Sequence, residues 1–116
     1  MNAPDFEYCT KEDWDPETGM APVKEKVIEA VKTLYAIIPD DFPPGKAAPI
    51  EAGIETWIEV EWPIASGLED DHAGILVDGP DSYIFSVQLG DFGLSGVTSS
   101  PETALDIVRR YGTGKV

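Results

Sequence analysis

Apolar and polar side chains alternate along nine residues, from Ile54 to Trp62. One set of positions is mostly apolar and the other mostly acidic: Ile54, Thr56, Ile58, Val60 and Trp62 against Glu55, Trp57, Glu59 and Glu61. Successive side chains of a β-strand point to opposite faces, so a period of two predicts a strand over 54–62 with one buried face. Pro63 ends the pattern.

This strand lies inside a long acidic segment. From Ala47 to Val108, 62 consecutive residues hold twelve carboxylates and no lysine or arginine. A disordered acidic tail lacks such apolar alternation, so the segment is expected to fold and to carry its charge on the surface. A protein that recognises this surface is expected to be basic.

The composition narrows the function classes further. A length of 116 residues fits one domain, and 42% apolar residues suffice for a core. The net charge of −14 disfavours direct binding to nucleic acid or to anionic membranes, because both need Lys and Arg. Cys9 is the single cysteine, and neither a signal peptide nor a membrane-spanning run is present, so a cytoplasmic location is expected.

Helical spacing of apolar residues predicts a helix over 22–38, with Pro22 in its first turn. Residues 39–53 hold four prolines and are expected to form a loop. Ser99 and Glu102 have the spacing of a capping box, which predicts a second helix over 100–111. Residues 1–21 are expected to be an acidic and aromatic arm or an edge strand.

Two further strands are predicted over 73–77 and 82–89, joined as an antiparallel hairpin by a turn at Asp78–Asp81. Residues 90–96 are glycine-rich and are expected to be flexible or bulged, while Val97 and Thr98 can add a short strand. The prediction is a single α+β domain over 1–116, with an antiparallel sheet of three to four strands and two helices packed on one face.

No fragment supports an enzyme, a cofactor site or a metal site. Gly45-Lys46 lacks the remaining residues of a phosphate-binding loop. The run from Glu69 to His72 lacks calcium-loop spacing and is expected to be a solvated turn. Catalysis by a cysteine and histidine pair would need Cys9 and His72 to meet from separate segments. We therefore predict a non-enzymatic protein without cofactors.

The candidate partner-binding residues lie on the acidic face of strand 54–62 and in two loops. They are Glu55, Trp57, Glu59 and Glu61 on the strand, Glu69, Asp70 and Asp71 in the first loop, and Asp78 and Asp81 in the second. A tryptophan among carboxylates is typical of an interface that binds a basic protein. The alternative is that a neighbouring strand or the N-terminal arm covers Trp57.

The leading functional hypothesis is a small inhibitor or neutraliser of a basic partner protein, of the immunity-protein or phage anti-defence type. A row of glutamates that imitates successive phosphates, as in a nucleic-acid mimic, is a variant of this hypothesis. One alternative is a secretion-type chaperone or assembly partner, and monomer and homodimer both remain open. Another is that the acidity reflects a high-salt host and is unrelated to function.

Overall fold

A computed structural model describes residues 22–39, 46–52, 55–62 and 71–112. In chain order the elements are α1 (Glu25–Ala36), β1 (Lys46–Ala52), β2 (Glu55–Trp62), β3 (His72–Gly79), β4 (Ser82–Leu89), β5 (Phe92–Thr98), α2 (Pro101–Ile107) and the π-helical turn η1 (Val108–Gly112). All neighbouring strands pair antiparallel, in the order β1-β2-β3-β4-β5. The α+β class is confirmed, but the sheet has five strands rather than three or four.

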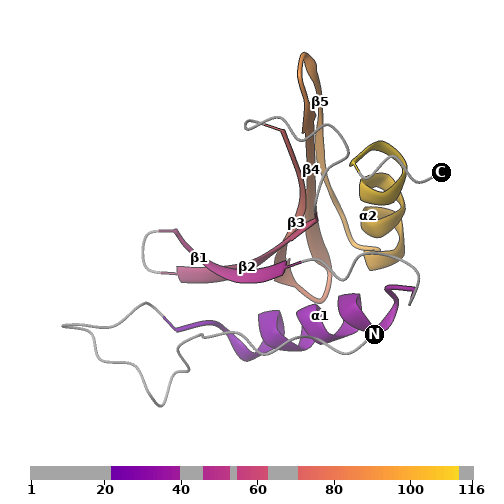
Figure 1. The fold of residues 1–116 in the computed structure, drawn as a ribbon. Coiled ribbons are helices and arrows are strands. Elements are labelled where there is room, and N and C mark those ends of the chain that lie inside the picture. The colour runs from indigo at the N-terminus through magenta and orange to yellow at the C-terminus, as the bar shows by residue number, and fades with distance from the viewer. Residues whose placement is uncertain (1–21, 40–45, 53–54, 63–70, 113–116) are drawn as a thin grey trace.

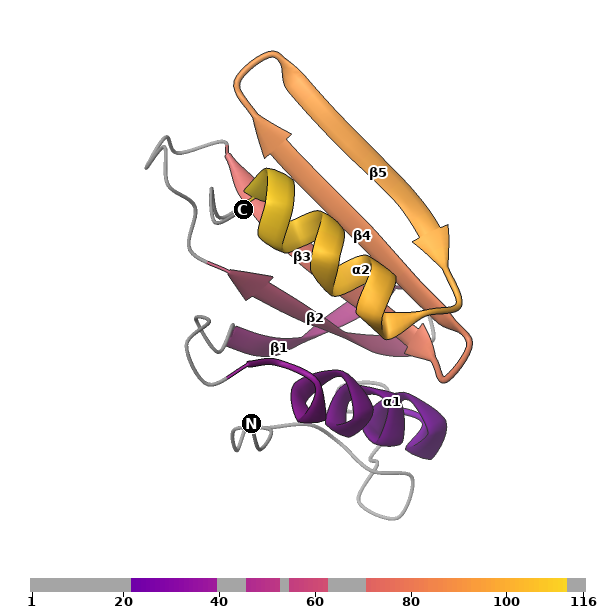
Figure 2. The same cartoon turned by 90° about the vertical axis from the view of Figure 1, so that its right-hand side faces the viewer.

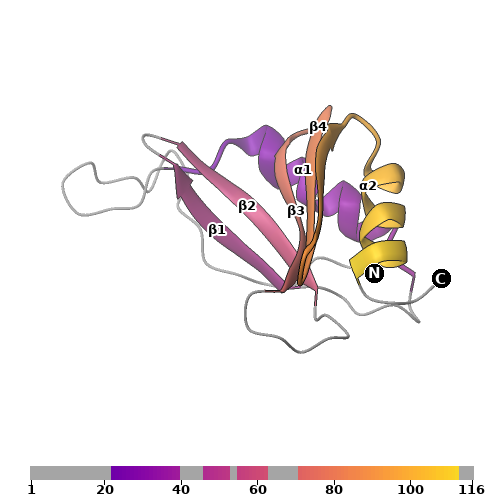
Figure 3. The same ribbon diagram turned by 90° about the horizontal axis from the view of Figure 1, so that it is seen from above.

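Both helices lie on the same side of the sheet (Figure 2). Helix α1 packs against β2 and β3, whereas α2 and η1 pack against β4 and its neighbours. The sheet twists strongly, so that β1 and β2 run across the direction of β4 and β5 (Figure 1). No element of the described chain covers the opposite face, which we call the helix-free face (Figure 3).

The core forms where the inward side chains of the strands meet the apolar stripes of the helices. Across the sheet, Ile58 pairs with Val77 and Val60 pairs with Ile75. All four side chains are fully buried, and each contributes about 2 kcal/mol of hydrophobic stabilisation. The helices supply the other layer of buried residues: Val27, Val31, Leu34 and Tyr35 from α1, and Ala104, Leu105 and Val108 from α2 and η1.

Strand β1 lies within the segment predicted to be a loop, and that prediction is wrong for Lys46–Ala52. Pro49 lowered the expectation of a strand because proline cannot donate a ladder hydrogen bond. Strand β1 is at the edge of the sheet and pairs only with β2, so a proline there can direct its missing N–H away from the ladder. Edge position, which the local sequence does not encode, makes the strand possible.

Strand β5 replaces the predicted flexible or bulged stretch. Gly90 and Asp91 form a two-residue turn from β4, and Gly90 adopts a left-handed φ of 58°. Gly96 pairs with Phe85, and a Cβ at Gly96 would lie 2.7 Å from Cζ of that ring. A cross-strand aromatic therefore covers the glycine and offsets part of its weak strand preference.

The first helix is shorter than predicted, whereas α2 and η1 together extend over 101–112, close to the predicted 100–111. Helix α1 begins at Glu25 after an extended Lys24, so Pro22 lies before the helix and not in its first turn. Helix α2 begins at Pro101 and is capped by Ser100, whose Oγ accepts a hydrogen bond from the Thr103 N–H at 3.2 Å, rather than by Ser99. None of the helices described combines the length and hydrophobicity needed to cross a bilayer. The predicted N-terminal arm over 1–21 lies outside the described residues.

Candidate binding surface

Strand β2 positions the acidic residues that the sequence pattern singled out. Its alternate residues Ile58, Val60 and Trp62 are buried against the helices. Trp57, Glu59 and Glu61 consequently point to the helix-free face, where Trp57 and Glu59 are half-buried and Glu61 is exposed. Glu55 begins the same strand and pairs with Ala52 of β1.

Apolar side chains from all five strands line the same face. Leu76 of β3 pairs with Ile84 of β4, and Ile84 pairs with Val97 of β5. Toward the β1 edge of the same face, Ile50 of β1 pairs with Trp57 of β2. These two rungs of the sheet are neighbours, and we call their five residues, Ile50, Trp57, Leu76, Ile84 and Val97, the apolar band. Ile50 and Val97 are 39% and 66% exposed, so the ends of the band are open to a partner.

Glu59 lies within this band, and its surroundings perturb its acidity. Its cross-strand neighbours are Ala48 of β1 and Leu76 of β3. Burial raises the pKa of Glu59 to about 7, and the hydrogen bond and negative charge of Glu61 add to the rise. Near neutral pH the carboxyl group of Glu59 is therefore partly protonated, and its charge responds to its neighbours.

Trp57 is neither fully covered nor fully exposed. Its cross-strand neighbour Ile50 belongs to β1, the strand that the sequence pattern did not predict. The indole consequently combines a fixed position in the sheet with contact area that remains available. A partly exposed tryptophan held by rigid strands is the type of residue that dominates binding energy at protein interfaces.

The acidic loops differ in what their carboxylates do. Asp71 is half-buried, and its Oδ1 accepts a hydrogen bond from the Gly90 N–H at 2.7 Å, which ties the start of β3 to the turn between β4 and β5. Asp81 is exposed in the turn before β4. Burial, and then the charges of Glu102 and Asp81, raise the pKa of Tyr83. Glu69 and Asp70 lie outside the described residues.

Asp78, predicted to lie in a loop, is in β3 and is the nearest to Trp57 among the loop candidates that the structure describes. It follows Val77, whose partner across the sheet is Ile58. The backbone of Asp78 therefore lies beside that of Trp57 on the neighbouring strand, and its side chain is half-buried. The structure thus gathers Trp57, Glu59, Glu61 and Asp78 on adjacent strands, while Asp71 and Asp81 lie at opposite ends of the β3–β4 hairpin.

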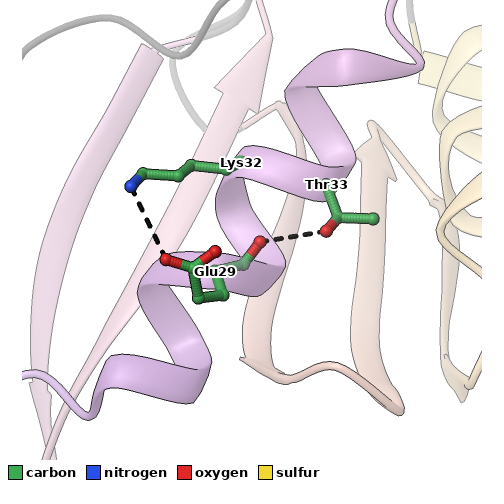
Figure 4. A network of polar contacts seen from close by, with 3 residues as sticks. All are labelled: Glu29, Lys32 and Thr33. Atoms are coloured by element: carbon green, nitrogen blue, oxygen red, sulfur yellow. Dashed lines mark hydrogen bonds and ion pairs between the residues drawn. The ribbon is translucent and has the colours of Figure 1, made fainter.

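The other polar contacts among the described side chains do not suggest a catalytic or metal-binding site. On α1, Lys32 Nζ lies 3.6 Å from Glu29 Oε1, and the Thr33 hydroxyl donates to the Glu29 carbonyl (Figure 4). Such an exposed pair adds little stability. On the helix-free face, His72 Nε2 and Ser86 Oγ lie 3.1 Å apart. Within the described ranges, no three His, Cys, Asp or Glu side chains are placed to hold a metal ion.

Sequence reasoning did not identify the apolar part of this surface. Leu76 was assigned to a generally apolar strand, and Ile84 to the outward side of a strand whose other face is Tyr83, Phe85, Val87 and Leu89. The signal that could have found them is Ile84 itself, an isoleucine between Ser82 and Ser86 at outward positions. Ile50 was out of reach because residues 39–53 were predicted to be a loop. Val97 was allowed a short strand, but two residues of strand do not define its face.

Comparisons with protein-family models, with curated proteins and with solved structures gave no significant match. The functional argument therefore depends on the geometry and charge of the helix-free face.

Proposed function

We propose that this protein is a small acidic binding protein that docks on a basic partner protein through its helix-free face and thereby inhibits or neutralises it. In the finer form of the proposal it belongs to the immunity-protein or anti-defence class, and its carboxylates occupy sites where the partner binds nucleic acid. The proposal includes no catalytic step and no cofactor.

The observation that carries the proposal is the Glu59 and Glu61 pair placed within the apolar band beside Trp57. An apolar centre with a tryptophan provides the desolvated contact that gives binding energy. Carboxylates in and around that centre select a lysine or arginine on the partner and speed its approach. Lys46 of β1 lies opposite Glu61, whereas strands β3 to β5 belong to the basic-free segment and bring no lysine or arginine to this face.

The raised pKa of Glu59 gives the interaction a further property. A cationic group from the partner favours the ionised form of Glu59, so docking releases the proton of this carboxyl group near pH 7. Partner binding is thus expected to become tighter as pH rises from 6 to 8, because less work is needed to remove that proton.

The test uses affinity capture from cell extract with four immobilised proteins: the wild type, Trp57→Ala, the double variant Glu59→Gln with Glu61→Gln, and a control. The control replaces Glu25 and Glu29, both exposed on α1, by glutamine and so removes the same number of carboxylates from the opposite side of the molecule. We expect a basic protein that the wild type and the control retain and the two face variants lose. Capture of acidic proteins alone, or equal capture by all four, contradicts the proposal.

A further inference from the structure

Strand β5 is an edge of the sheet. It pairs with β4 on one side and with no described element on the other. In an antiparallel ladder the N–H and C=O groups of alternate residues point to opposite sides, so every second residue of β5 presents unpaired backbone groups outward. Such an edge is a template for another strand.

The two edges of the sheet differ in how they are protected. Strand β1, at the far edge, contains Lys46, Pro49 and Glu51, and charged residues and proline are the residues by which proteins prevent strand addition. Strand β5 has the sequence FGLSGVT, without a charge and without a proline. Only β5 therefore lacks a barrier against pairing.

Exposed hydrophobic side chains gather at the same edge. Among the described residues the large exposed ones are Ile50, Phe92, Val97 and Tyr111, and the last three lie on β5 or against it. Phe92 stacks on Tyr111 of η1 with ring centroids 6.0 Å apart, on the helix side of the sheet. Val97 is 66% exposed on the helix-free face. Apolar surface thus flanks the free edge on both faces.

The charge near β5 indicates which molecule can approach. From Phe92 to Gly112 the chain has two acids, Glu102 and Asp106, and two bases, Arg109 and Arg110, and so is neutral in a protein of net charge −14. Asp106 and Arg110 pair at 3.5 Å. With Asp91, which is exposed in the turn before Phe92, this stretch carries a net charge of only −1, so a basic partner finds little excess of carboxylates at this edge. A second copy of the acidic chain, which is repelled elsewhere, meets little repulsion here.

We propose that two copies of this protein associate through antiparallel pairing of their β5 strands, around a twofold axis perpendicular to the sheet, to form a continuous ten-stranded sheet. The register that pairs all seven residues of β5 places Ser95 on the axis and Val97 opposite Gly93 of the other copy. Both pairs of helices then lie on one side, and the two helix-free faces join into one surface. This inference does not depend on the proposed function.

The first measurement is the mass in solution by light scattering. A dimer has twice the chain mass of 12.6 kDa. Ser95→Lys and Ser95→Glu each place like charges face to face on the axis, so each variant is expected to be a monomer. When the two variants are mixed, opposite charges meet, and the dimer mass is expected to return. Ala36→Lys, on the exposed end of α1, adds a lysine away from the edge and is expected to remain a dimer.

A cysteine crosslink tests the register without a new charge. In a chain that carries Cys9→Ser, Ser95→Cys is expected to give a covalent dimer with a short bifunctional thiol reagent, because facing residues of an antiparallel pair have Cβ atoms only about 5 Å apart. Ser99→Cys, exposed but beyond the end of β5, is expected not to crosslink. A wild type that stays monomeric into the millimolar range overturns the proposal. So does a dimer that persists in both charged variants and does not crosslink at position 95.

Discussion

Replacement of Glu59 by glutamine tests whether the apolar surroundings of this carboxyl control the pH dependence of folding. The amide has the shape of the protonated acid. It can donate a hydrogen bond to Glu61, as the protonated carboxyl group of Glu59 does. It cannot ionise. The variant therefore keeps the neutral side chain at every pH and removes the titration that the wild type undergoes.

The sign and the size of the expected change in the free energy of unfolding follow from the pKa of Glu59. In the folded protein the pKa of Glu59 is raised from 4.5 to about 7, so between these values the folded state holds a proton that the unfolded state releases. This contribution to stability is present below pH 4.5 and is lost as pH rises through 7. The full shift corresponds to about 3 kcal/mol. Because Glu59 is only half-buried and water screens it, we expect about 1 kcal/mol.

The assay is urea unfolding at several pH values between 5 and 8 at constant ionic strength, followed by tryptophan fluorescence. Trp62 is buried and reports on the sheet. We expect the stability of Glu59→Gln relative to the wild type to increase as pH rises from 5, and the variant to be more stable by about 1 kcal/mol at pH 8. The difference in stability between the two proteins cancels every pH effect that the substitution does not change. A difference that does not change with pH would refute the reasoning.

Three other predictions concern stability. Ser100→Ala removes the cap of α2 and is expected to cost about 1 kcal/mol in thermal unfolding, whereas Ser99→Ala costs almost nothing. Gly96→Ala forces the ring of Phe85 to move and is expected to cost about 1 to 3 kcal/mol, part of which Phe85→Leu restores. Asp71→Ala removes the 2.7 Å bond to the turn between β4 and β5, and hydrogen exchange of that turn amide is expected to speed up without a comparable change in the core.

The helix-free face connects the two proposals without making either depend on the other. A partner that binds the apolar band and the Glu59 pair uses the middle of the sheet, whereas self-association uses the edge at β5. A dimer would double the face available to a basic partner. A dimer would also fit the alternative of an assembly chaperone. The four-protein capture experiment separates the inhibitor from the chaperone, because an inhibitor retains one basic protein selectively.

Local patterning accounted for the central elements of the fold. The alternation from Ile54 to Trp62 identified β2 and its outward acids, because a period of two depends only on the geometry of a strand. The hairpin of β3 and β4 followed from its turn residues and its apolar alternation. The cap of α2 was displaced by one residue, since Ser99 and Ser100 are both suitable caps and only the start of the helix distinguishes them.

The edges of the sheet were beyond local patterning. Strand β1 contains Pro49, and β5 contains Gly93 and Gly96, which in isolation favour loops. They become strands because β2 and β4 offer complete ladders on which to pair, and Phe85 covers one of the glycines. Long-range pairing supplies free energy that no window of neighbouring residues contains.

From the sequence alone came the acidic character of the chain, the buried and exposed sides of its central strand, and the identity of the carboxylates beside Trp57. The tertiary structure decided what surrounds those carboxylates. By pairing β2 with β1 and β3, it set Glu59 between Ala48 and Leu76 and completed an apolar band from Ile50 to Val97. The charge of a side chain follows from its residue type, which the sequence gives directly. How far a carboxylate is desolvated depends on the residues beside it, and across a sheet the strand register decides which residues those are.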